Sequence, residues 1–123
     1  MITHIHSTHI PVKDQDAAVD FYVNTLGFVV TMDNQVSPDM RWITVSAPGA
    51  QTNLALMSAS CVGPVQEHTG IAFVSDDIDA DYVKLTAAGV KFKSAPVLEP
   101  WGDKGVHFCD PDGNEFYLNG PAK

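Results

Sequence analysis

Basic residues are scarce in this chain of 123 residues, which has 7 Lys and Arg against 15 Asp and Glu and a net charge of -8. A protein that binds nucleic acid or an anionic membrane surface needs a basic patch, and this composition leaves little material for one. We therefore expect no nucleic-acid partner and no membrane partner. A small molecule or a second copy of the chain is the expected partner.

Long apolar runs are also missing. No window approaches the roughly 20 apolar residues of a membrane-spanning helix, and Met1 to His6 contain no basic segment of a signal peptide. The chain has only two cysteines, Cys61 and Cys109, far apart and without a C-x-x-C motif. This usage is typical of a reducing compartment, so we expect a cytoplasmic protein in which Cys109 is an unreactive strand residue.

A strand-turn-strand signal stands out near the end of the chain, from Phe108 to Leu118. Asp110-Pro111-Asp112-Gly113 is turn chemistry, and β-prone residues flank it on both sides. The sequence predicts a hairpin here. Because side chains alternate along a strand, Glu115 and Tyr117 are expected on one face.

The predicted elements occur twice, in the same order. In each half, a strand leads to an aspartate that can cap a helix, and a glycine, Gly27 or Gly89, follows the helix. The expected strands of the first half are 4–12, 28–32, 41–47 and 53–57, with loops at 33–40 and 58–66. Those of the second half are 69–75, 90–92 and the two strands of the hairpin, with a loop at 96–105.

Each half therefore reads β-α-β-β-β, and the two helices are offset by about 62 residues, which indicates an internal duplication. We expect a single α+β domain over residues 1–123, with one module over about 1–60 and the second over about 67–123. Its two tandem βαβββ modules would form a curved, mixed sheet that leaves a cavity for a ligand.

This order resembles the vicinal-oxygen-chelate superfamily, which includes glyoxalase I, bleomycin-resistance proteins and extradiol dioxygenases. The resemblance rests on Asp20-Phe21-Tyr22 with Leu26-Gly27-Phe28, on Gly70-Ile71-Ala72-Phe73 with Asp76-Asp77, and on Phe108 with Asp110-Pro111-Asp112-Gly113-Asn114. It covers essentially the whole chain. It implies the glyoxalase/bleomycin-resistance fold, without indicating which activity the chain has.

The resemblance also implies a divalent metal held by His, Glu or Gln side chains from four strands. Those four positions fall on Ser7, Ala55, Gly70 and Tyr117. Alanine and glycine cannot bind a metal through a side chain, and serine and a phenol are poor ligands. We therefore expect a cavity without a metal or any other cofactor.

The same alternation predicts what lines the cavity instead. Arg41, Ile43 and Val45 are expected to share the cavity face of their strand, with Trp42 packing against a helix. The expected wall consists of His9, Arg41, Asn53, His68, His107, Glu115 and Tyr117, with Trp101 on a loop over the mouth. The plain structural alternatives are solvent-exposed strand ends for His9 and His68, a rim carboxylate for Glu115, a solvated Arg41, and purely packing roles for Tyr117 and Trp101.

Three functions fit this wall. The first is a binding protein that sequesters a small organic ligand through Arg41, Asn53, His68, Trp101 and Tyr117. The second is a metal-free lyase or isomerase in which His9, His107 or Glu115 moves protons. The third is a metal-dependent lyase or dioxygenase with a displaced metal site, built from the histidines and Glu115. We favour the first, and the resemblance further implies a homodimer.

Overall fold

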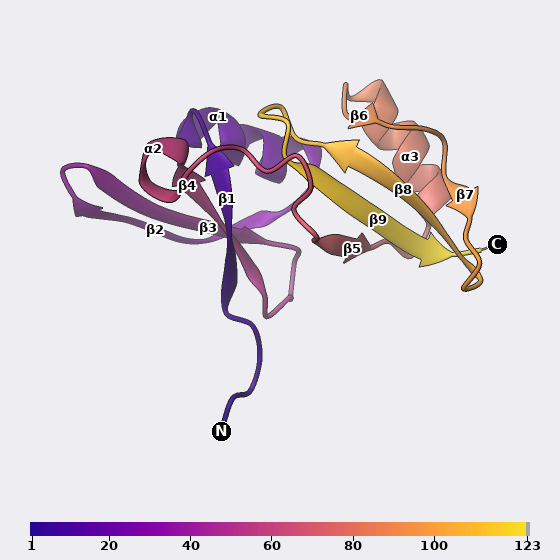
Figure 1. Cartoon of the computed structure of the whole chain (residues 1–123), viewed down its shortest axis with the longest axis horizontal. Coiled ribbons are helices and arrows are strands. Elements are labelled where there is room, and N and C mark those ends of the chain that lie inside the picture. The colour runs from indigo at the N-terminus through magenta and orange to yellow at the C-terminus, as the bar shows by residue number, and fades with distance from the viewer. Residues whose placement is uncertain (123) are drawn as a thin grey trace. The chain divides into compact units, whose positions relative to one another are not determined.

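The computed structural model describes residues 1–122 and divides into two compact units, Met1–Val65 and Gln66–Lys123 (Figure 1). Each unit contains one mixed sheet and few helices. The predicted α+β class and the repeated element order are confirmed. The strand order is β1-β4-β3-β2 in the first sheet and β5-β9-β8-β6 in the second, and β7 pairs with β8.

The first unit begins with a strand and a helix, and the second part of this helix is a π-helical turn. Asp14 caps the helix, since its side chain accepts a hydrogen bond from the Ala17 amide, as the sequence predicts. Its elements are β1 (Ser7–Val12), α1 (Gln15–Asp20), the π-helical turn η1 (Phe21–Thr25), β2 (Val29–Ser37), β3 (Met40–Ser46), β4 (Asn53–Ser58) and α2 (Ala59–Val62). β1 runs parallel to β4, and the other pairs are antiparallel.

The second unit repeats this plan. Asp77 caps its helix by accepting a hydrogen bond from the Ala80 amide. Its elements are β5 (Ala72–Val74), α3 (Ile78–Ala87), β6 (Lys91–Phe92), β7 (Val97–Leu98), β8 (Asp103–Cys109) and β9 (Glu115–Pro121). β5 runs parallel to β9, and the predicted hairpin is the antiparallel pair β8–β9.

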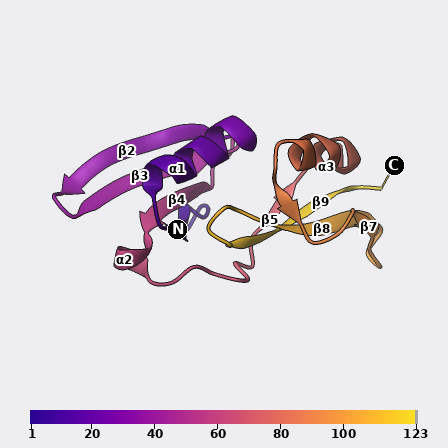
Figure 2. The ribbon, with the colours of Figure 1, turned by 90° about the horizontal axis from the view of Figure 1, so that it is seen from above.

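The second sheet buries one face beneath its helix. In the second unit α3 lies over the sheet (Figure 2). A Cβ added at Gly120 of β9 would come within 2.9 Å of Ile78 on α3. The side chains on this face of β8 and β9 are buried, namely Val106, Phe108, Phe116 and Leu118. Alternation therefore turns His107, Glu115 and Tyr117 to the opposite face.

Three loop predictions are wrong. Residues 33–37 extend β2, and their side chains are exposed, which is why no hydrophobic alternation marks them. The segment 58–66 contains the short helix α2, and the segment 96–105 contains β7 and the start of β8. The strand expected at 69–75 is assigned only from Ala72 to Val74.

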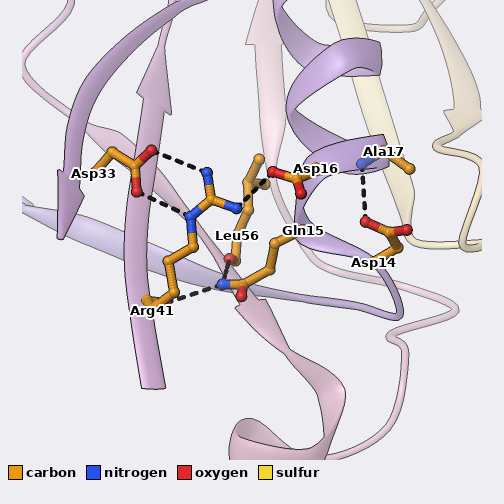
Figure 3. Close-up of polar contacts among 7 residues, drawn as sticks. All are labelled: Asp14, Gln15, Asp16, Ala17, Asp33, Arg41 and Leu56. Atoms are coloured by element: carbon orange, nitrogen blue, oxygen red, sulfur yellow. Dashed lines mark hydrogen bonds and ion pairs between the residues drawn. The ribbon is translucent and has the colours of Figure 1, made fainter. Parts of the chain in front are cut away.

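The predicted orientation of the third strand is also wrong. Arg41 faces α1, where its guanidinium pairs with Asp16 at 2.6 Å and with Asp33 of β2 at 2.9 Å (Figure 3). Trp42 lies on the other face, where its ring meets the His9 ring edge-on at a centroid distance of 5.9 Å. Alternation correctly predicts that Arg41 and Trp42 lie on opposite faces of this strand. It does not reveal which of the two faces the helix covers.

Within residues 1–122, no helix combines the length and the apolar character needed to cross a membrane.

Candidate functional site

A pocket of about 320 Å³ opens on the face of the second sheet that α3 does not cover. It lies entirely within the second unit. Its lining consists of His68, Gly70, Ile71, Ala72, Trp101, His107, Glu115, Phe116 and Tyr117. The volume is at the lower end of the range of roughly 300–1,000 Å³ found for small-molecule sites.

Glu115 is the centre of the polar groups in this pocket. Its Oε2 lies 3.3 Å from His68 Nδ1 and 3.5 Å from His107 Nδ1. Its Oε1 lies 3.4 Å from the Lys93 ammonium. The carboxylate is mostly buried, with 17% of its side chain exposed, whereas the His68 side chain is 73% exposed.

Two strands and one extended segment bring these groups together. In the β8–β9 ladder His107 pairs with Tyr117 and Cys109 with Glu115, so alternate residues share the pocket face. The segment that carries His68 is tied to β9 on both sides of it, because Glu115 N donates to Gln66 O and Thr69 N donates to Glu115 O. His68 is thus held beside Glu115, 47 positions away in the sequence.

The turn motif of the hairpin also positions this segment. The Asp110 carboxylate accepts hydrogen bonds from the Asn114 backbone amide and from its side-chain amide, each at 2.9 Å. The Asn114 side-chain oxygen then accepts from the Gln66 backbone amide at 2.9 Å. Asn114 is fully buried, so the motif works as a clamp between the hairpin turn and the chain that leads to His68.

The pKa of Glu115 lies below its ordinary value. Burial by itself would raise it, but hydrogen bonds from His68 and Lys93 and the charge of His107 together outweigh burial. Burial raises the pKa of Tyr117, and the nearby Glu99 and Asp103 charges add to this effect. Near neutral pH the pocket therefore offers a carboxylate and a neutral phenol.

Two buried polar atoms of the pocket have no hydrogen-bond partner among the described residues, His107 Nδ1 and the Tyr117 hydroxyl. A Cβ added at Gly105 would come within 1.6 Å of that hydroxyl, so the absence of a side chain at Gly105 makes room for the Tyr117 ring. Buried groups of this kind usually have a hydrogen-bond partner, so both atoms are available to bond a molecule that enters the pocket.

Trp101 projects from the turn between β7 and β8. Glu99 N donates to Asp103 O, and Gly102 N donates to Glu99 O, which closes the turn around Trp101. The Trp101 side chain is 63% exposed although it lines the pocket. An exposed indole at a pocket mouth offers a flat apolar surface for stacking.

The structure collects five of the eight residues that the sequence singles out in this pocket: His68, Trp101, His107, Glu115 and Tyr117. The other three lie in the first unit. There His9 contacts Trp42, Arg41 forms its ion pairs, and the Asn53 amide is engaged, since it donates to His6 O and accepts from Thr31.

Sequence reasoning missed Lys93. The β6–β8 register pairs Lys91 with Cys109 and Phe92 with Phe108, and Lys93 N donates to His107 O. This pairing extends one residue beyond β6 and places Lys93 beside His107. The alternation Lys91-Phe92-Lys93 was a usable signal, because it puts Phe92 towards the core and both lysines away from it.

Comparisons with known proteins place these observations in a family. Residues 2–118 match the family described as the Glyoxalase/Bleomycin resistance protein/Dioxygenase superfamily. The chain is 34% identical to YetH of Bacillus subtilis over 119 residues, which cover 96% of this chain and 98% of YetH. It is 35% identical over 117 residues to a protein of Shewanella frigidimarina, covering 87% of this chain and 85% of that protein. Both relatives are described as uncharacterized.

Solved structures are similar over nearly the full length. A superfamily member from Sphaerobacter thermophilus is 47% identical, with a TM-score of 0.93 over 97% of this chain and 98% of its own. TnmS3 from a Streptomyces species, described as an antibiotic binding protein, is 38% identical, with a TM-score of 0.86 over 98% of both chains.

The four positions at which the superfamily resemblance implies metal ligands do not fit a metal here. Ala55 is fully buried, and Gly70 has no side chain and a φ of +74°, a conformation that a ligating residue would adopt only with strain. The phenol of Tyr117 stays protonated because its pKa is raised. Ser7 alone offers a weak oxygen donor, and a single weak donor does not hold a divalent metal.

Proposed function

Because the chain belongs to the glyoxalase/bleomycin-resistance/dioxygenase superfamily, we propose that it binds a small, flat organic molecule in the pocket of its second unit. The observation that carries this proposal is the combination of an exposed Trp101 with an unpartnered Tyr117 hydroxyl in one pocket. The indole supplies a stacking surface, and the buried hydroxyl gains its missing hydrogen bond from the ligand.

The likeness to an antibiotic binding protein supports binding without chemical change. TnmS3 is 38% identical over nearly all of both chains, so the comparison extends beyond the fold. Stacking and hydrogen bonds suffice for such binding, and neither needs the four superfamily metal positions.

The charge of the chain favours a cationic ligand. A net charge of -8 attracts cations and repels anions at distances up to the Debye length, about 8 Å at physiological ionic strength. Of two aromatic ligands of similar size, the cationic one should therefore bind more tightly. A homodimer is part of the proposal too, on the ground of the superfamily resemblance.

Tryptophan fluorescence tests the proposal, because the chain has only two tryptophans, Trp42 and Trp101. We expect proflavine, a flat cationic dye, to quench the fluorescence saturably, with a Kd at least about tenfold lower than that of the anionic 8-anilinonaphthalene-1-sulfonate. The matched variants are Trp42→Phe, which keeps the quenching, and Trp101→Phe, which loses it.

Quenching that persists in Trp101→Phe and disappears in Trp42→Phe would contradict the proposed site. Equal affinity for the two dyes would contradict the electrostatic part of the proposal and leave stacking as its basis.

Acid–base catalysis in the same pocket is the second candidate. The mostly buried Glu115 carboxylate, whose Oε2 has two histidine nitrogens at 3.3 and 3.5 Å, can accept a proton and pass it on. Consumption of a bound ligand that stops in Glu115→Gln, while the quenching of Trp101 is retained, would favour this candidate over sequestration.

A further inference from the structure

The ligating atoms of His68, His107 and Glu115 all lie within 4.8 Å of one another. We propose that these three side chains form a binding site for one divalent transition-metal ion, such as Zn²⁺. The site is distinct from the four superfamily positions. His68 and Glu115 each precede one of them, Gly70 and Tyr117, by two residues, so the ligands are displaced along β9 and along the segment that is hydrogen-bonded to its start.

The distances between the donor atoms fit a single ion. Zinc takes nitrogen and carboxylate ligands at about 2.0–2.2 Å in a tetrahedral arrangement, in which two ligand atoms are roughly 3.3–3.5 Å apart. Glu115 Oε2 lies 3.3 Å from His68 Nδ1 and 3.5 Å from His107 Nδ1. Two of the three distances between ligand atoms therefore already fit a tetrahedral ion. The exposed His68 ring can rotate to bring the third distance into range.

The unsatisfied nitrogen of His107 supports the same conclusion. His107 Nδ1 is buried, it has no hydrogen-bond partner within residues 1–122, and it faces the Glu115 carboxylate at 3.5 Å. This separation is long for a charge-assisted hydrogen bond, which is usually about 2.7–2.9 Å. An ion between the two atoms would satisfy both at once.

The scaffold holds two of the ligands rigidly. His107 and Glu115 lie on the paired strands β8 and β9, with Cys109 opposite Glu115 in the register. His68 is held by the two backbone hydrogen bonds that join its segment to β9. Preorganised ligands of this kind lose little conformational entropy when an ion binds.

The ligand set determines which ions fit. Two imidazoles and one carboxylate select Zn²⁺ and its first-row neighbours over Mg²⁺ and Ca²⁺, which prefer all-oxygen sites. Three protein ligands leave a fourth position open, as in catalytic zinc sites. Because Trp101 and Tyr117 line the same pocket, that position faces the space in which an organic ligand is proposed to bind.

One neighbouring positive charge, the Lys93 ammonium, opposes the binding of a cation. The Lys93 ammonium lies 3.4 Å from Glu115 Oε1, whereas the two histidine nitrogens lie near the other oxygen, Oε2. The Lys93 side chain is 61% exposed, so it can move into solvent when a cation arrives. Replacing Lys93 by methionine should therefore tighten metal binding, which no purely structural role of Lys93 predicts.

The test is a titration of tag-free, chelator-stripped protein with ZnCl₂ by calorimetry and with CoCl₂ by visible absorption. We expect one ion per chain, and cobalt bands typical of low coordination number. His107→Ala and Glu115→Gln should each weaken binding by at least about 100-fold, since even the loss of an outer-shell partner costs about 10- to 100-fold. Lys93→Met should strengthen binding by several fold. Unchanged thermal midpoints of the metal-free variants would show that they are folded.

The controls address the other histidines. His4 and His6 are exposed and have the spacing of an adventitious metal chelate, and His9 lies in the first unit. The His4→Ala/His6→Ala double variant and His9→Ala should keep the site intact within about twofold. Binding that disappears in the double variant and persists in His107→Ala would overturn the proposal, as would no binding below about 100 μM. Proflavine binding, measured without metal, decides the proposed ligand binding separately.

Discussion

At the scale of single residues, the site depends on the conformation and size of two glycines. Gly105 leaves room for the Tyr117 ring, and the positive φ of Gly70 excludes a ligating side chain at that position. Sequence reasoning singled out Gly70 and Tyr117, because the superfamily resemblance implies metal ligands at these two positions, but it did not single out Gly105. It did not reveal that the buried Tyr117 hydroxyl has no hydrogen-bond partner among residues 1–122, since the position of this hydroxyl depends on Gly105 across the hairpin.

The first prediction concerns that hydroxyl. Tyr117→Phe should leave the stability of the ligand-free protein unchanged or raise it by up to about 1 kcal/mol, because it removes a buried polar group that has no hydrogen bond. The same change should weaken the binding of a hydrogen-bonding ligand. Urea unfolding measures the stability, and Tyr82→Phe on α3 is the matched control. A loss of more than about 1 kcal/mol would show that the hydroxyl has a partner in the folded protein.

At the scale of elements, polar side chains join the first helix to its sheet. The Gln15 side-chain amide donates to Arg41 O at 2.9 Å and to Leu56 O at 2.8 Å, and so bridges β3 and β4 (Figure 3). Asp14, the helix cap, was readable from the sequence because caps are local. The sequence did not predict the role of Gln15, because both of its hydrogen-bond partners are distant in the sequence.

Gln15→Ala should cost about 1–3 kcal/mol of unfolding free energy, because it leaves two carbonyl oxygens without their donor. Chemical denaturation followed by circular dichroism measures this loss. The matched control is Gln51→Ala, on an exposed turn, which should change stability by less than about 0.5 kcal/mol. Equal effects of the two substitutions would show that the Gln15 bridge contributes nothing.

The ion pair of Arg41 and Asp33 gives a pH-dependent prediction. Hydrogen bonding to Arg41 lowers the pKa of Asp33, so its contribution is complete above the unfolded pKa of about 3.9 and is lost as the pH falls through the lower, folded value. Asp33→Asn should therefore lower the urea midpoint at pH 7 relative to the unchanged protein. The difference should shrink as the pH is lowered below about 3.9, and a difference that grows on acidification would refute the assignment.

At the scale of the whole chain, the internal duplication was the feature that could be predicted most directly from the sequence. The repeated caps Asp14 and Asp77 and the hairpin around Asp110 rest on local chemistry, and the structure confirms them. The extent of β2 was not readable, because its exposed residues 33–37 show no hydrophobic pattern. The orientation of Arg41 and Trp42 depends on which face a helix covers, a long-range property that alternation does not contain.

The predicted site residues are also distributed unequally between the two units. Both halves contributed candidates, yet the pocket that the structure shows belongs to the second unit and collects five of the eight. The contact of His68 with Glu115 spans 47 positions and depends on the buried clamp of Asp110 and Asn114. Side chains so far apart in the sequence meet only through tertiary structure.

The most direct test of the central claim is two-dimensional ¹H–¹⁵N NMR of the labelled protein during a proflavine titration. The two indole N–H signals report separately on Trp42 and Trp101. The account predicts that the Trp101 signal and the backbone amides of residues 68–72 and 115–117 shift saturably, while the Trp42 signal stays in place. A titration in which the Trp42 signal moves and these second-unit signals do not would contradict it.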